Sequence, residues 1–129
     1  MQKKVMIFDN DEGILDIMQE ALVYEGFEVK TIQETDNIFP LLDDYQPDIL
    51  LIDYLLNGIN GGEICHQIKD NDSTHNLPVI IISAYPKVLQ SLGDYKCNAF
   101  IAKPFNLYEL IDKISELVDY SPKIRYTNV

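Results

Sequence analysis

The sequence is short of basic residues and of long apolar runs, and each shortage excludes a class of protein. It has 10 Lys and Arg against 21 Asp and Glu, which gives a net charge of −11. Such a chain lacks the cationic face that nucleic acid or an anionic membrane surface demands, so we expect neither as a direct partner. No apolar run approaches the roughly 20 residues of a membrane-spanning helix.

Cysteine and histidine are also scarce. Two cysteines, Cys65 and Cys97, favour reduced thiols in a cytosolic protein. Cys65 and His66 are neighbours on a predicted helix and face different ways, and His75 lies in a polar loop, so no metal site of this type is predicted. The N-terminal "MQKKVMIFD" has neither a long apolar core nor a small-residue cleavage site, so we predict no signal peptide and a cytoplasmic location.

The length and composition predict one globular domain. A chain of 129 residues with 47% apolar residues can bury roughly two-thirds of its unfolded surface without disulfides. We assign residues 1–119 to this domain. Residues 120–129 have no clear periodicity and are interpreted as a C-terminal tail or the start of a linker.

Strand and helix patterns alternate five times along the chain. Five apolar runs predict strands at 4–8, 27–31, 48–53, 78–83 and 99–103. The third and fourth are continuously apolar, which is typical of parallel strands covered on both faces, whereas the second alternates like an edge strand. Helical patterns occupy 13–25, 37–45, 61–70, 86–93 and 106–118. This alternation predicts an α/β fold, a doubly wound parallel sheet with helices on both faces.

Two of the helices carry clear end signals. Gly26 is a good C-terminal stop for the first helix, and Asn106 can cap the last one. In the first helix we expect one buried apolar stripe, formed by Ile14, Ile17, Met18, Ala21 and Leu22.

Polar side chains gather where the strands end. Asp9, Asn10 and Asp11 follow the first strand, and Asp53 ends the third. Ser83 ends the fourth and Lys103 the fifth. Ligands of doubly wound sheets bind at the carboxyl ends of the strands, so these residues are expected to share one site.

This set of residues suits phosphoryl chemistry. Carboxylates from two strands can hold a hard cation such as Mg²⁺. A carboxylate can also accept a phosphoryl group and form an aspartyl phosphate, with metal, lysine and hydroxyl stabilising the phosphoryl oxygens. Asp53, which stands alone after "ILLI", is the predicted nucleophile.

Over residues 3 to about 119 the chain resembles a response-regulator receiver domain of two-component signalling, of the single-domain type. The resemblance is carried by "FDND", by "LLIDYLLNGINGGEI" around Asp53, by "PVIIISAY" with Ser83 and by "FIAKPF" with Lys103. It implies a flavodoxin-like sheet with strand order 2-1-3-4-5. It also implies Mg²⁺-dependent transfer of a phosphoryl group to Asp53 from a histidine kinase or a phosphotransfer histidine.

The resemblance assigns further roles. Ser83 and Lys103 would contact the phosphoryl group, and Ser83 and Phe100 would form the switch. The metal ligands would be Asp9, Asn10, Asp53 and the backbone carbonyl of Leu55. Leu55 and Tyr85 would flank the path of hydrolytic water, and because neither positions water well we predict a long-lived phosphoryl group. A cis peptide is implied between Lys103 and Pro104.

We expect no enzymatic activity beyond self-catalysed phosphotransfer and autodephosphorylation, and a monomer or weak homodimer. Output would pass through a changed surface to a downstream protein that the sequence does not name. The phosphodonor protein is predicted to dock beside the first helix, on an outward-facing Leu15 together with Pro104 and Phe105, because small apolar patches beside reactive sites serve as contact surfaces.

The sequence departs from the family pattern at two positions. Asn10 replaces the second of two adjacent acids, which removes a charged metal ligand, and Asn57 replaces a proline. One alternative is therefore a phosphorylation-independent interaction module on the same fold. Another is a haloacid-dehalogenase-type phosphatase, because "IFDNDEGILD" resembles its opening, with Asp9 as nucleophile and Asp11 as general acid. Glu12 stands where that family has glycine.

Overall fold

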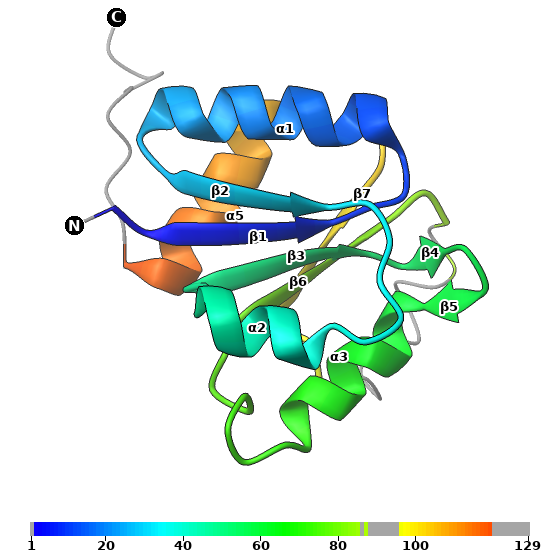
Figure 1. Cartoon of the computed structure of the whole chain (residues 1–129). Coiled ribbons are helices and arrows are strands. Elements are labelled where there is room, and N and C mark those ends of the chain that lie inside the picture. The colour runs from blue at the N-terminus through cyan, green and yellow to red at the C-terminus, as the bar shows by residue number, and fades with distance from the viewer. Residues whose placement is uncertain (1, 86, 88–95, 120–129) are drawn as a thin grey trace, which may run out of the picture.

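The computed structural model describes residues 2–85, 87 and 96–119. Five strands form one parallel sheet in the order β2-β1-β3-β6-β7 (Figure 1). These strands are β1 (Lys4–Phe8), β2 (Glu28–Ile32), β3 (Ile49–Asp53), β6 (Val79–Ser83) and β7 (Ala99–Ala102). A small antiparallel hairpin follows β3, formed by β4 (Leu55–Leu56) and β5 (Ile59–Asn60). The helices are α1 (Glu12–Glu25), α2 (Phe39–Tyr45), α3 (Gly61–Lys69) and α5 (Leu107–Val118).

The predicted fold class and strand order are confirmed, with β6 and β7 as the fourth and fifth strands of the sheet. Each predicted strand agrees with the structure to within one residue at either end, and each described helix to within two. The helix predicted over 86–93 lies, apart from residue 87, outside the described residues. The two-residue strands β4 and β5 were not predicted.

Alternating side chains divide the core into two layers. On one face of the sheet α1 and α5 pack on inward residues such as Val5, Ile7 and Leu51. On the other face α2 and α3 pack on residues such as Met6 and Ile52 (Figure 1). Every residue of β3 and β6 is buried, which explains their continuous apolar sequences, because successive side chains of a strand point to opposite faces.

The helix ends are fixed by local hydrogen bonds. The Asp11 carboxylate accepts from the backbone N–H groups of Gly13 and Ile14 and so begins α1, while Gly26 ends it with a φ of 116°. The side chain of Asn106 accepts from the Glu109 N–H and begins α5. The predicted roles of Gly26 and Asn106 are confirmed.

The predicted stripe of α1 was wrong in its orientation. Leu15 is 4% exposed and lies in the core with Met18 and Leu22, whereas Ile17 is 61% exposed. The buried residues of α1 are at positions 15, 18, 22 and 25, and this spacing of three or four residues places them on one face of the helix. Apolar residues crowd both sides of this helix, so the periodicity alone allowed a neighbouring stripe to be chosen.

None of the helices in the described ranges is long and apolar enough to pass through a bilayer.

Candidate functional site

The predicted residues meet at the carboxyl edge of the sheet. A cavity of about 470 Å³ lies there. Its lining includes Asp9, Asn10, Asp11, Asp53, Leu55, Asn57, Gly58, Ser83, Tyr85 and Lys103. Parallel strand pairing produces this convergence, because it places the ends of β1, β3, β6 and β7 side by side.

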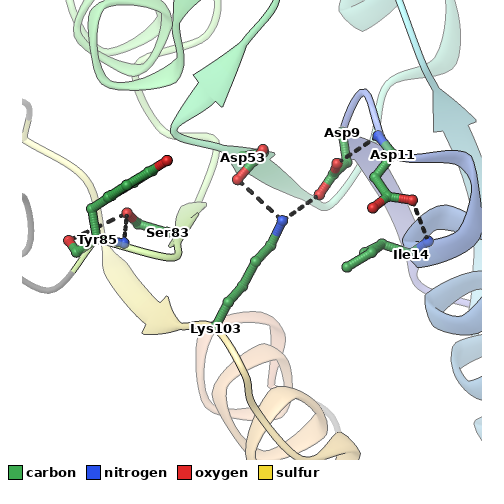
Figure 2. A network of polar contacts seen from close by, with 7 residues as sticks. All are labelled: Asp9, Asp11, Ile14, Asp53, Ser83, Tyr85 and Lys103. Atoms are coloured by element: carbon green, nitrogen blue, oxygen red, sulfur yellow. Dashed lines mark hydrogen bonds and ion pairs between the residues drawn. The ribbon is translucent and has the colours of Figure 1, made fainter.

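Lys103 joins the two central carboxylates. Its Nζ lies 3.1 Å from Asp9 Oδ2 and 3.4 Å from Asp53 Oδ1. Figure 2 shows the ammonium reaching up between the two acids from the end of β7. Asp9 is 1% and Asp53 8% exposed, so these charges interact with little screening by water.

Burial and charge shift the pKa values of this group. Burial raises the pKa of the Asp53 carboxyl, and the neighbouring Asp9 carboxylate raises it further, against the opposing effect of Lys103. Burial by itself would lower the pKa of Lys103, but the charges of Asp53 and Asp9 outweigh it and the pKa is raised. The ammonium is therefore held in its charged form, between two acids that repel one another.

Ser83 and Tyr85 lie on the side of Asp53 away from Asp9 (Figure 2). The buried Ser83 hydroxyl accepts a hydrogen bond of 3.0 Å from the Tyr85 N–H. The side chains of Tyr85 and Leu55 are 52% and 54% exposed at the cavity. Phe100, the predicted switch residue, is 41% exposed on the edge strand β7.

Asn10 is hydrogen-bonded to the hairpin that follows Asp53. Its Nδ2 donates to Asn57 Oδ1 at 3.1 Å, which links the loop after β1 to the tip of the β4–β5 hairpin. Asp11 is occupied differently, since its carboxylate caps α1. In the described part of the chain no three His, Cys, Asp or Glu side chains form a metal-binding group. The ligand set that the resemblance implies has two carboxylates, one amide and one backbone carbonyl.

The docking residues agree with the prediction only in part. Leu15 was expected to face outward and is buried, because it lies at the centre of the stripe that packs on the sheet. Pro104 is exposed, and Phe105 packs partly against the core. The peptide between Lys103 and Pro104 is cis, as expected. Ile17, which was predicted to be buried, and Tyr108, which was not singled out, are exposed and line one groove between α1 and α5.

Comparison with known proteins settles the family. The family model of the response regulator receiver domain matches residues 5–115. The chain belongs to this family. It is thus a receiver domain of the two-component type, and this match over residues 5–115 takes the place of the haloacid-dehalogenase interpretation.

Two proteins from named organisms are similar to this chain over most of its length. The phosphate regulon transcriptional regulatory protein PhoB of Rhizobium meliloti is 28% identical over 120 residues, which are 92% of this chain and 53% of PhoB. The chain therefore spans about half the length of that relative. A CheY-like receiver domain protein from Methanospirillum hungatei is 25% identical with a TM-score of 0.83, covering 92% of this chain and 95% of that one.

The response regulator TrrA from Thermotoga maritima, crystallised in complex with Mg²⁺–BeF, shares the fold. Its TM-score is 0.80 at 23% identity, with 90% of this chain and 99% of that one covered.

Proposed function

We propose that this receiver accepts a phosphoryl group on Asp53 from a phosphohistidine of a histidine kinase or phosphotransfer protein. The observation that carries the proposal is the position of the Asp53 carboxylate, which opens on the cavity with the Lys103 ammonium 3.4 Å away. A nucleophile with a cation beside it is what phosphoryl transfer requires, because the barrier is mainly electrostatic.

Mg²⁺ is the proposed cofactor. Asp9 and Asp53 would bind it through carboxylates, Asn10 through its amide oxygen and Leu55 through its backbone carbonyl. Hard oxygen ligands around one cavity fit this ion, and two carboxylates with one ammonium leave the group one negative charge in excess. When bound, the ion would neutralise charge on the phosphoryl oxygens.

In the proposed reaction an Asp53 carboxylate oxygen attacks the phosphorus. The new bond is a P–O bond, the P–N bond to the donor imidazole breaks, and the imidazole leaves with its electron pair. Lys103 then turns from the acid pair toward the new phosphoryl oxygens. The Ser83 hydroxyl can donate to the same oxygens once it gives up its long bond to the Tyr85 carbonyl, and Ser83 and Phe100 would form the switch.

The remaining assignments follow from this role. We propose no catalysis of an external reaction, a cytoplasmic location, and a protein partner for output, with the chain acting as a monomer or weak homodimer.

One observation favours the second candidate, a phosphorylation-independent interaction module. Asn10 supplies no negative charge: its Nδ2 donates to Asn57, and only its neutral amide oxygen is left as a metal ligand.

Phosphorylation by a small donor separates the two candidates. The purified chain is incubated with acetyl phosphate, with Mg²⁺ or with EDTA, and its intact mass is measured. We expect one phosphoryl group per chain with Mg²⁺, none in EDTA and none in Asp53→Asn. A chain that stays unmodified with Mg²⁺ present would favour the interaction module.

A further inference from the structure

Two Asn-Gly pairs lie within one short segment, Asn57-Gly58 and Asn60-Gly61. In such a pair the backbone nitrogen of glycine can attack the side-chain amide carbon of asparagine. Glycine permits this most readily because it has no Cβ to restrict the backbone. The structure places the two pairs in opposite environments.

Hydrogen bonds hold both residues of the second pair, Asn60-Gly61. The Asn60 side chain caps α3 by accepting from the N–H groups of Gly62 and Glu63, at 2.7 and 3.3 Å, and it donates to the Tyr54 hydroxyl. The attacking atom is also engaged, because the Gly61 N–H donates to the Tyr54 carbonyl at 2.7 Å. Gly61 is buried against the backbone of Asp53 so closely that a Cβ would collide with it.

The first pair, Asn57-Gly58, is exposed to solvent. Asn57 and Gly58 are both exposed, at the tip of the β4–β5 hairpin. Gly58 has a φ of 70°, and nothing lies within 4 Å of the place a Cβ would take. The Asn57 side-chain oxygen accepts the hydrogen bond from Asn10. That single bond is solvent-exposed, whereas the Asn60 side chain makes two cap bonds and a bond to Tyr54.

We propose that Asn57 is a site of spontaneous deamidation that adds a carboxylate to the rim of the acceptor cavity. A bond forms between Gly58 N and Asn57 Cγ, and the proton of Gly58 N leaves with the side-chain nitrogen as ammonia. Water then opens the resulting succinimide at either carbonyl, giving aspartate or isoaspartate. The step needs only water as co-reactant.

The product changes the charge of the cavity. The new carboxylate lies beside Asn10, at the point where this receiver lacks an acid, and it raises the acids that line the cavity from three to four. It should therefore strengthen the attraction for a divalent cation. This consequence rests on the proposed function, whereas the modification itself does not.

Peptide mapping tests the modification, and the second Asn-Gly pair provides the internal control. The folded chain is aged at mildly alkaline pH in EDTA, and the conversion of each asparagine is followed by mass spectrometry. A matched sample is aged in denaturant. Attack at Asn60 requires the Gly61 N–H bond and the side-chain cap bonds to break first, so Asn57 should convert at least about tenfold faster than Asn60 in the folded chain, a difference of about 1.4 kcal/mol.

In denaturant the two rates should become similar, since both pairs then lack structure. Equal rates in the folded chain, or an unchanged Asn57, would overturn the proposal. The charge effect is measured by calorimetric titration of Mg²⁺ into Asn57→Asp and the unmodified chain, without any phosphodonor. Tighter binding supports the role at the cavity and unchanged binding refutes it, and both results are independent of whether Asp53 can be phosphorylated.

Discussion

Three side chains set the charge at the centre of this receiver. Asp9 and Asp53 bring two negative charges, and Lys103 returns one positive charge at 3.1 and 3.4 Å. Asn10 also lines the cavity, but its side chain is neutral and donates a hydrogen bond to Asn57. The strength of cation binding should therefore depend on single substitutions around this group.

Asn10→Asp should tighten Mg²⁺ binding. A carboxylate in place of the amide adds a charged ligand and gives up the donor that holds Asn57. After allowing for repulsion by the neighbouring acids, we expect a gain of roughly tenfold in affinity, measured by calorimetric titration. Asn37→Asp is the matched control, because it adds the same charge away from the cavity and aspartate can still accept from the Phe39 N–H. Equal affinities for Asn10→Asp and the unchanged chain would show that residue 10 is not a ligand.

Asp53→Asn should stabilise the metal-free protein at neutral pH. The pKa of Asp53 is raised in the folded state, first by burial and then by Asp9. The folded chain thus binds this proton more tightly than the unfolded chain, and stability is lost as the pH rises through the folded pKa. In EDTA, the melting temperature of Asp53→Asn should exceed that of the wild type at neutral pH. The difference should vanish as the pH falls toward 3.8. A lower melting temperature for the variant at neutral pH would contradict this account.

Leu55 and Tyr85 should lengthen the life of the phosphoryl group. Both line the cavity and are about half exposed, and neither can orient a water molecule as an amide or carboxylate does. Leu55→Asn and Tyr85→Glu should each speed dephosphorylation several-fold, and the double variant more. The phosphodonor is removed, and the remaining fraction of phosphorylated chain is then measured over time. Rapid decay in the unmodified chain, or no acceleration in the double variant, would argue against water exclusion by this pair.

At the scale of elements, predictability followed the strength of the pattern. The continuous apolar sequences of β3 and β6 indicated buried parallel strands and nothing else. Gly26 and Asn106 are residue types that commonly end and begin helices, so these two helix ends could be predicted. In α1, apolar residues lie on both sides of the buried stripe, so its orientation depended on packing against the sheet. The β4–β5 hairpin has two residues in each strand, too few to show a period.

The corrected orientation of α1 gives a matched pair of substitutions. Leu15→Ala, in the core, should cost about 2–4 kcal/mol of unfolding free energy, measured by urea denaturation. Ile17→Asp, on the exposed side, should cost less than about 0.5 kcal/mol.

If the phosphodonor docks on the groove between α1 and α5, Ile17→Asp should also slow phosphotransfer from a histidine donor at least about tenfold, while leaving acetyl phosphate unaffected. Unchanged transfer from the protein donor would exclude this groove as the docking surface.

At the scale of the whole molecule, topology explains why most of the site could be predicted. Asp9, Asp53, Ser83 and Lys103 each follow or end a strand of one parallel sheet, so the fold class alone brings them together. The bond from Asn10 to Asn57 could not be predicted, because it depends on the conformation of a hairpin with no sequence pattern.

The most direct test of the central claim is to locate the phosphoryl group after transfer from a phosphorylated histidine protein. The labelled chain is treated with borohydride, which reduces an aspartyl phosphate to homoserine, and peptides are sequenced by mass spectrometry. The account predicts homoserine at position 53 with Mg²⁺, and none in EDTA or in Asp53→Asn. A label at another residue, or one that persists in Asp53→Asn, would contradict it.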